Sequence, residues 1–469
     1  MDVPAAPRPL TGDAPATVAG EMRALVALAG PLVVANLLHM TIYATDVIFV
    51  ARLGTVALAA ATLGVYLYSV IMWALIGLVG AAAPVIAAEL GRRRHAVRQV
   101  RRTFRMAMWL AVLASLPFML LLANGERLLL LADQDPVVAA HAGAFLRILL
   151  LALIPAALSG VMRVTAAALG RAGWATAIAA VALGVNLLGN WLLVFGHAGF
   201  PALGLAGSAI ASVVTNATMV LAYAAILVVD PRLRRYRLFG KWWHTEWSRL
   251  RELVRLGVPI ALTLTFEGAL FSSAGFLMGL IGVTEVGAHA IALQIAAIAF
   301  QVPFGVSQAA TIRVGMAYGA GDRVGIARAG WVALAGGIGF MTVTASLLVL
   351  FPRPFVSVYI DVDAPANARL VALALQYLVI AAFFQLFDGA QVVAAGVLRG
   401  IQDTRVPMLA AAFGYWVVGF GTALLLGFVA HWQGYGIWLG LAAGLAAVSA
   451  LLLWRWIRRD ALGLIPRTA

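Results

Sequence analysis

The chain has 469 residues, of which 63% are hydrophobic and only 11% are charged, and its mean hydropathy is +0.97. Soluble proteins carry about 25% charged residues, so 19 acids and 33 bases are too few to coat a water-soluble molecule of this length. The composition therefore excludes a soluble enzyme and indicates a membrane protein. Because the chain has no cysteine, disulfides, thiolate metal sites and thiol catalysis are excluded as well.

A membrane-spanning helix needs roughly 20 mostly apolar residues. Twelve such helices are predicted, near residues 24–50, 56–88, 107–123, 145–168, 175–195, 203–229, 253–281, 286–310, 331–350, 371–398, 408–430 and 436–456. We expect residues 1–23, which are rich in Pro and Ala, to form a short disordered tail and not a signal peptide. The predicted class is an all-α membrane protein.

The distribution of Lys and Arg predicts the orientation, because cytoplasmic loops carry an excess of these residues. Twelve spans place both termini on one side, and 28 of the 33 bases are assigned to that side, Arg163 and Arg399 among them. The other five are Arg52, Arg127, Arg147, Arg353 and Arg369. Both termini are therefore predicted to be cytoplasmic. Attraction to anionic lipid headgroups accounts for the basic loops, so no nucleic-acid partner is expected.

The chain divides into two similar halves at a long basic linker, residues 230–252. Six spans precede it (24–229) and six follow it (253–457), before a cytoplasmic tail at 458–469. A shift of 228 residues places the helix-punctuating residues of the first half on those of the second without a gap: Pro31 on Pro259, Gly54 on Gly282, Gly77 on Gly305 and Gly91 on Gly319. Each half starts on the same side, which predicts parallel repeats around a central cleft, an architecture typical of transporters.

Three of the 19 acids fall inside predicted spans, namely Asp46, Glu267 and Asp388. A charge at the centre of a membrane helix costs roughly 2.5–3.5 kcal/mol, so we expect all three to face the protein interior. Asp46 lies close to the end of its span, where a snorkelling or capping role competes with a functional one. Glu267 and Asp388 lie deeper, without Arg or Lys within two turns of their own helix, and a functional role is favoured for them.

Uncharged polar residues recur near these acids at helical spacing. In the second half they are Gln294, Gln301 and Gln308 on one span and Gln385 and Gln391, with Phe384, around Asp388; in the first half they are Asn36, His39, Asn186 and Asn190. A single amide is more often a link between helices than a ligand. Their clustering around unpaired acids predicts a polar lining of the cleft.

The chemistry of such acids suits an antiporter. A carboxylate removed from water favours its protonated form and releases the proton when water or a cation arrives. It can equally hold Na⁺ through carboxylate and amide oxygens, with Glu267 and Asp388 as candidate ligands, or pair with an organic cation. Competition for one acidic site couples the fluxes. The coupling ion, Na⁺ or H⁺, stays open, and no other cofactor is expected.

Three segments resemble motifs of the multidrug and toxic compound extrusion (MATE) transporters: TDVIFVARLGTVALAAATLG from Thr45, GVTEVGAHAIALQIAAIAFQVPFGVSQAATIRVGMAYGAGD from Gly282, and QLFDGAQVVAAGVLRGIQDTRVPM from Gln385. They match the first-to-second, seventh-to-eighth and tenth-to-eleventh helix regions of that family. Acids in the seventh and tenth spans make the chain most similar to the bacterial NorM-like branch. Phe384 departs from a Tyr with which some relatives help to bind the cation.

This resemblance implies export of cationic amphiphilic compounds across a bacterial inner membrane, driven by Na⁺ or H⁺. It further implies that Glu267 and Asp388 bind the coupling cation in the second half, and that Asp46 is the first-half acid with Asn186 and Asn190 as its amide neighbours.

Two other functions compete with this one. A flippase for lipid-linked oligosaccharide, from the same superfamily, would need a cationic cleft for a pyrophosphate, whereas the predicted cleft is acidic and the arginines are assigned mainly to loops. An intramembrane aspartyl protease could pair Asp46 with Asp388, but it would leave the third deep acid unexplained. We therefore expect a transporter without enzymatic activity. It is expected to be a monomer in the bilayer that acts on organic cations, because no large soluble domain offers a surface for oligomerisation.

Overall fold

The computed structural model describes residues 17–92, 96–240 and 242–465, and all regular structure within these ranges is helical. Twelve helices in this part of the chain are long and apolar enough to cross a membrane. The predicted all-α membrane architecture of twelve spans is therefore confirmed.

The described part of the first half contains nine α-helices, of which α5 lies between two spans. Their bounds are α1 (Val18–Ala51), α2 (Thr55–Gly80), α3 (Ala82–Arg92), α4 (Ala96–Ala123), α5 (Gly125–Leu131), α6 (Pro136–Leu149), α7 (Leu153–Ala168), α8 (Gly173–Phe195) and α9 (Leu205–Val229). Helices α2 and α3 form one span with a turn at Ala81, and a 3₁₀ turn, η1 (Leu150–Ala152), joins α6 to α7.

The last six spans follow a connection that contains one 3₁₀ turn, η2 (Arg234–Tyr236). Their helices are α10 (Trp247–Ile281), α11 (Val283–Ala320), α12 (Arg323–Leu350), α13 (Pro352–Ser357), α14 (Ala368–Gly400), α15 (Arg405–Ala412), α16 (Gly421–Leu424) and α17 (Gln433–Ile457), with a 3₁₀ turn η3 (Pro365–Asn367) before α14. Two π-helical segments, η4 (Phe413–Phe420) and η5 (Leu425–Val429), flank α16 within the eleventh span.

Several predicted spans are too short. Helix α4 begins at Ala96 and not at 107, the fourth span begins at Pro136 and not at 145, and α11 ends at Ala320 and not at 310.

Helix α1 begins at Val18, because the Thr17 hydroxyl oxygen accepts a hydrogen bond from the Gly20 amide at 3.1 Å and caps the helix. The predicted disordered tail, 1–23, is therefore too long at its C-terminal end, and residues 1–16 lie outside the described residues. Helix α10 likewise begins at Trp247, inside the segment 230–252 that was expected to be a linker.

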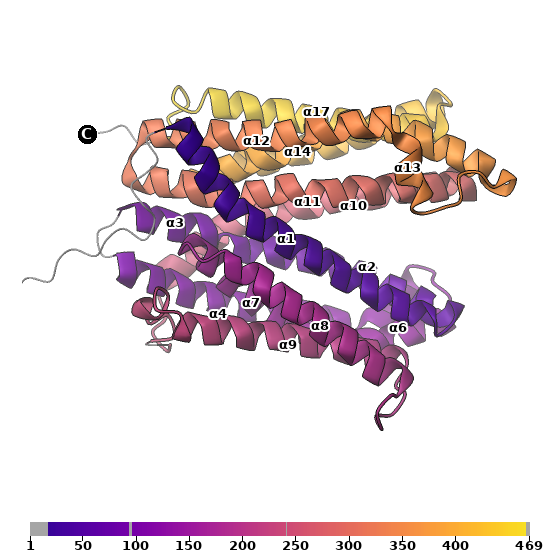
Figure 1. The fold of residues 1–469 in the computed structure, drawn as a ribbon, viewed down its shortest axis with the longest axis horizontal. Helices are drawn as coiled ribbons and strands as arrows, with labels where there is room; N and C mark the ends of the chain where they lie inside the picture. Colours follow the sequence, from indigo (N-terminus) through magenta and orange to yellow (C-terminus); the bar gives the residue numbers. More distant parts are fainter. Residues whose placement is uncertain (1–16, 93–95, 241, 466–469) are drawn as a thin grey trace, which may run out of the picture.

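Helices α1–α9 and α10–α17 occupy the two sides of the molecule, indigo to magenta and orange to yellow in Figure 1. The first turns of α1 cross over, so that Leu25 and Ala29 belong to the hydrophobic core of the second half. The first turns of α10 cross in the opposite direction, so that Leu253 and Ile260 belong to the hydrophobic core of the first half. This exchange interlocks the two halves.

Two pairs of the glycines repeated in the two halves, Gly77 with Gly305 and Gly91 with Gly319, lie where those halves are in close contact. A Cβ atom at Gly91 would overlap the carbonyl oxygen of Met316, and one at Gly319 would overlap that of Ala88. These two contacts are equivalent under the 228-residue shift, as are the contacts of Gly77 with Ala261 and of Gly305 with Val33. The repeat therefore has a packing role, because only glycine allows two helix backbones to come so near.

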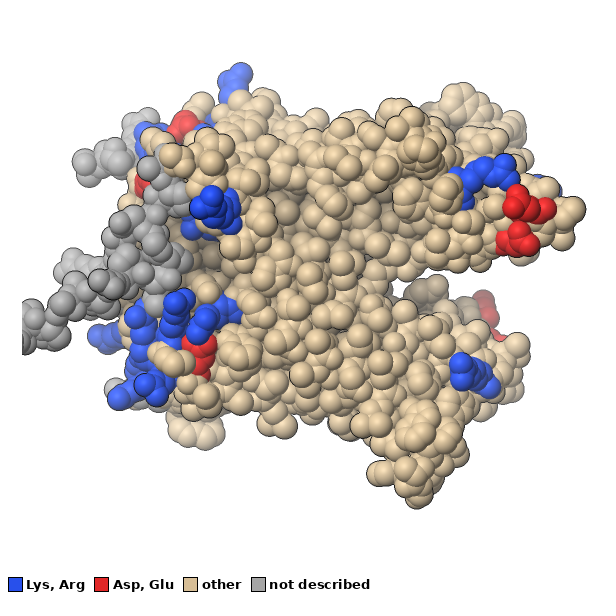
Figure 2. All heavy atoms as spheres, in the orientation of Figure 1, with Lys and Arg blue, Asp and Glu red and all other residues tan. Residues whose placement is uncertain are grey.

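The two ends of the molecule differ in charge and in packing. Lys and Arg gather at the end of the molecule where helix α1 begins, and at the opposite end the surface is hollowed between the two halves (Figure 2). We call these the tail end and the open end. The contacts of Gly91 and Gly319 lie near the ends of α3 and α11, and they close the tail end.

Candidate functional site

Three adjoining cavities lead from the first half into the second. A first-half cavity of about 330 Å³ is lined by Asp46, and a central cavity of about 340 Å³ is lined by Asn36 and Arg163. A second-half cavity of about 280 Å³ is lined by Glu267 and Asp388. The central cavity shares His39, Tyr43, Asn216 and Met219 with the first, and Trp73, Gln301 and Phe304 with the third. The cavities therefore form one continuous cleft with an acid at each side.

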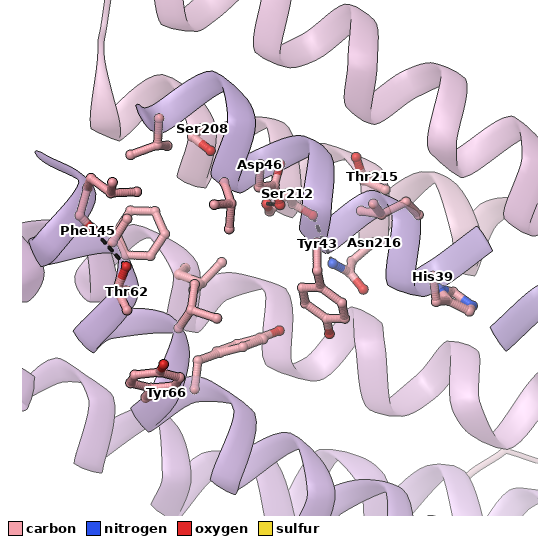
Figure 3. Close-up of a pocket in the computed structure, with 18 of the residues that line it drawn as sticks. His39, Tyr43, Asp46, Thr62, Tyr66, Phe145, Ser208, Ser212, Thr215 and Asn216 are labelled. Carbon is pink, nitrogen blue, oxygen red and sulfur yellow. Dashed lines mark hydrogen bonds between the residues drawn. The ribbon is translucent and has the colours of Figure 1, made fainter. Parts of the chain in front are cut away.

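In the first-half cavity, Asp46 is surrounded by neutral donors. The Asn186 and Asn190 amides donate to its Oδ1 at 2.9 and 2.8 Å, and the Ser212 hydroxyl donates to its Oδ2 at 3.0 Å. Figure 3 shows Asp46 beside Ser212, with Tyr43 and His39 further along α1. A carboxylate has about four acceptor sites, so Oδ2 can still accept a bond from a ligand. The structure thus brings together Asp46, Asn186 and Asn190.

Sequence reasoning missed Ser212 and Asn216 of α9. The signal was available, because Ser208, Ser212 and Asn216 are spaced four residues apart and share one helix face. All three line the first-half cavity (Figure 3).

In the second-half cavity, one amide bridges the two acids. The Gln391 side chain donates from the same Nε2 to Glu267 Oε1 at 3.0 Å and to Asp388 Oδ1 at 3.3 Å. The Tyr415 hydroxyl, which the sequence did not single out, donates to Gln391 Oε1 at 3.0 Å. Glu267 and Asp388 are only 8% and 4% exposed. Two carboxylates held this close repel each other when both are ionised, so the pair favours a proton or a cation between them.

The other predicted polar residues have different surroundings. Gln301 lines both the central and the second-half cavities, whereas Gln294 is exposed and is not among the residues that line them. It lies two turns, about 10 Å, further along α11. Gln385 is buried, and its Oε1 accepts a hydrogen bond from Thr344 of α12 at 3.1 Å. A step of three residues turns a helix by about 300°, so Gln385 and Asp388 face different neighbours.

Phe384 lines the second-half cavity as an apolar wall. Its ring packs edge to face on Phe271 and Trp438, with centroids 5.8 and 5.6 Å apart. Asn36 lines the central cavity, and its Oδ1 accepts a hydrogen bond from Arg163 at 3.2 Å.

The sequence places Arg163 and Arg399 among the bases of the cytoplasmic side and does not predict that they line the cleft. Arg163 lies inside α7 and Arg399 inside α14. Both line a small cavity of about 80 Å³ beneath the central one, where Gly77 and Ile260 mark the packed interface of the halves. The cleft is therefore acidic at its sides and basic at its floor. The sequence did not reveal this because an Arg near the end of an apolar run has the same pattern whether the helix stops or continues.

Such a fold and site, with paired six-span halves around a cleft that holds buried acids, define a secondary transporter. The MatE family model matches residues 31–192 and 259–425 of the chain. A probable multidrug resistance protein NorM of Mesorhizobium japonicum is 49% identical over 94% of each chain. A multidrug resistance protein NorM of Burkholderia vietnamiensis is 39% identical over 94% of this chain and 95% of its own.

Solved structures agree with this match. The eukaryotic MATE transporter AtDTX14 aligns with a TM-score of 0.84 over 95% of this chain and 98% of its own, at 21% identity. A multidrug resistance MATE family transporter in an outward-facing conformation aligns equally well, at 18% identity over 94% and 97%. The chain belongs to the MATE family and is a multi-pass membrane transporter.

Proposed function

We propose that the protein is a multidrug efflux antiporter that exports cationic amphiphilic compounds in exchange for Na⁺ or H⁺. The observation that carries this proposal is the placement of Asp46, Glu267 and Asp388 in one cleft, each without an ion-pair partner among the described residues. An acid in a membrane interior is costly unless it binds something. The names of the NorM relatives support the substrate class.

Competition between the coupling cation and the substrate for the acids would couple the inward flux of the cation to the outward flux of the substrate. With the bridged pair Glu267 and Asp388 charged, a coupling cation or a cationic substrate relieves their repulsion, and binding of one disfavours the other. The pair suits a proton or a monovalent cation. The amide of Gln391 is already used between the acids and Tyr415.

Alternating access would follow from rocking of the two halves about their interface. Lys and Arg gather at the tail end (Figure 2), so the tail end is the cytoplasmic side of the bacterial inner membrane in this proposal. The structure is then the state open to the outside. No nucleic acid takes part, and the working unit is a monomer in the lipid bilayer.

The test is gradient-driven efflux of ethidium from vesicles that contain the purified protein. Glu267→Gln and Asp388→Asn are expected to lower efflux at least tenfold, because each removes a negative charge on which the exchange depends. Glu126→Gln is the matched control, since Glu126 pairs with Arg147 outside the cleft. Undiminished efflux in both cleft variants contradicts the assignment. Efflux at fixed pH with and without a Na⁺ gradient then identifies the coupling ion.

One observation favours the flippase alternative: Arg163 and Arg399 line the cleft floor and could bind a pyrophosphate. A lipid-linked pyrophosphate would still have to pass three carboxylates in the same cleft, which disfavours it. If no organic cation competes with ethidium for the purified protein, the flippase becomes the better proposal.

A further inference from the structure

The positively charged Arg163 lies at the floor of the cleft and has no role in the proposed antiport. A charge inside a membrane protein is costly, and it is usually paired or functional. Arg163 donates a hydrogen bond to the neutral Asn36 oxygen at 3.2 Å. Among the described residues it forms no ion pair. A guanidinium has five donors in a planar fork, so most of this fork is available to an anion.

The surroundings of Arg163 form a cavity and not a packed core. The central cavity of about 340 Å³ is lined by Arg163 together with Asn36, His39, Tyr223 and Gln301. Its volume lies in the range of pockets that bind drug-sized ligands, which is roughly 300–1,000 Å³. Arg163 also lines the smaller cavity below, with Arg399, so the floor carries two positive groups. The potential there favours an anionic ligand group.

The position of Arg163 relative to Asp46 sets the shape of that ligand. Asn36, His39, Tyr43 and Asp46 lie three or four residues apart and form one stripe along α1. The stripe begins at the partner of Arg163 and ends at the first-half acid, about 15 Å along the helix axis. The two cavities between these ends share His39 and Tyr43. A ligand with a cation at one end and an anion at the other therefore matches both ends of one cleft.

We propose that the central cavity is an anion subsite, in which Arg163 binds a carboxylate of zwitterionic amphiphilic substrates while Asp46 takes their amine. This inference rests on the proposed efflux function and names a substrate class for the same cleft. Tyr43 and Met219, which line both cavities, provide apolar contact surface between the two charges. A planar carboxylate fits the guanidinium fork through two parallel hydrogen bonds. Arg163 is in this scheme a specificity residue.

The test uses two dyes that differ only at this group. Rhodamine 110 carries a free carboxylate, and rhodamine 123 is its methyl ester and lacks the negative charge. Equilibrium binding to the purified full-length protein is measured by fluorescence anisotropy for wild type, Arg163→Gln and Arg163→Lys. The control is Arg147→Gln, which also removes one Arg but at an exposed pair with Glu126.

We expect Arg163→Gln to weaken rhodamine 110 binding roughly tenfold relative to rhodamine 123, because a charge-assisted hydrogen bond is lost. Arg163→Lys should retain part of the preference, and Arg147→Gln should retain all of it. A ratio of dissociation constants that is the same in Arg163→Gln and wild type overturns the proposal. So does a wild-type protein that binds neither dye. In that case ethidium efflux by the same preparation shows that the antiport function survives.

A second measurement works on the wild-type protein if Arg163→Gln does not fold. Phenylglyoxal modifies accessible guanidinium groups, and peptide mass spectrometry locates the product. Rhodamine 110 is expected to slow modification of Arg163 at concentrations at which rhodamine 123 does not. Equal protection by the two dyes, or protection by neither, overturns the anion subsite.

Discussion

At the scale of single residues, the cleft is organised by amides that hold carboxylates in place. Asp46 receives two amide donors, and Gln391 donates to both Glu267 and Asp388. These amides are uncharged, so they position the acids without neutralising them. The acids consequently keep their capacity to bind a proton, a metal cation or an amine. An Arg in the place of Gln391 would fill that capacity permanently.

Replacement of Gln391 by Met should show whether the bridge between the two acids matters for transport as well as for stability. The change leaves the Tyr415 hydroxyl and both carboxylates without their shared partner, so we expect a stability loss of about 1–3 kcal/mol together with a loss of efflux per molecule. Gln385→Met is the matched control, since Gln385 is buried in the same helix but bonds Thr344. Thermal unfolding and vesicle efflux measure the two effects. Equal efflux in the two variants would argue against a role for the bridge.

At the scale of helices, α1 and α10 hold the tail end closed through two ion pairs. Helix α1 supplies the acid of one pair, and helix α10 supplies the base of the other. Glu21 of α1 accepts two hydrogen bonds from Arg313 of α11, at 2.8 and 2.7 Å. Arg249 of α10 pairs with Glu89 of α3 at 2.6 Å. Glu21 and Arg249 are equivalent under the 228-residue shift. The same position of the repeat therefore carries the acid in one half and the base in the other, and each pair joins the two halves.

Breaking one of these pairs should release the tail end. Arg313→Gln leaves Glu21 buried without its partner, which disfavours the closed arrangement. Because the natural chain has no cysteine, a single Ala88→Cys, at a position that is 1% exposed, reports opening through its rate of maleimide labelling. We expect Arg313→Gln to speed labelling several-fold, and the exchange of Glu21→Arg with Arg313→Glu to restore the slow rate.

Arg323→Gln serves as the control for that experiment. It removes a pair with Asp460 that joins residues of the second half only. Faster labelling in this control would mean that general loosening, and not the pair between the halves, sets the rate.

At the scale of the whole molecule, the repeated glycines allow the two halves to close on each other. Gly91 and Gly319 meet backbone of the opposite half so closely that no side chain fits. The state that the structure shows, closed at the tail end, depends on this fit. A transporter that alternates between two states must be able to reach both of them.

Gly91→Leu and Gly319→Leu are therefore expected to lower efflux by about tenfold, since overpacking of this kind costs about 1–3 kcal/mol. Labelling of Ala88→Cys should become faster in both, because the tail end no longer closes. Gly339→Leu is the control, as a Cβ atom there meets nothing within 4 Å. Normal efflux in the Gly91 and Gly319 variants would show that this contact is not needed in the cycle.

The sequence by itself determined the number of spans and the duplication, and it singled out the three acids that line the cleft. These properties follow from local hydropathy and from the cost of charge in a membrane, both of which can be evaluated along the chain. Helical spacing placed Asn186 and Asn190 on one face, and the resemblance to MATE motifs implied that they lie beside Asp46. The sequence did not indicate the burial of four further acids, Glu21, Glu89, Asp230 and Glu285.

The tertiary structure alone decided which side chains meet across the two halves. Gln391 and Tyr415 join at the second-half acids, and Arg163 and Arg399 form the floor of the cleft. Ser212, which is far from Asp46 in sequence, donates a hydrogen bond to the Asp46 carboxylate. Helical spacing fixes the face of a residue only on its own helix, and the rotation of each helix is set by packing against its neighbours. For that reason the basic floor of an otherwise acidic cleft became visible only in the folded molecule.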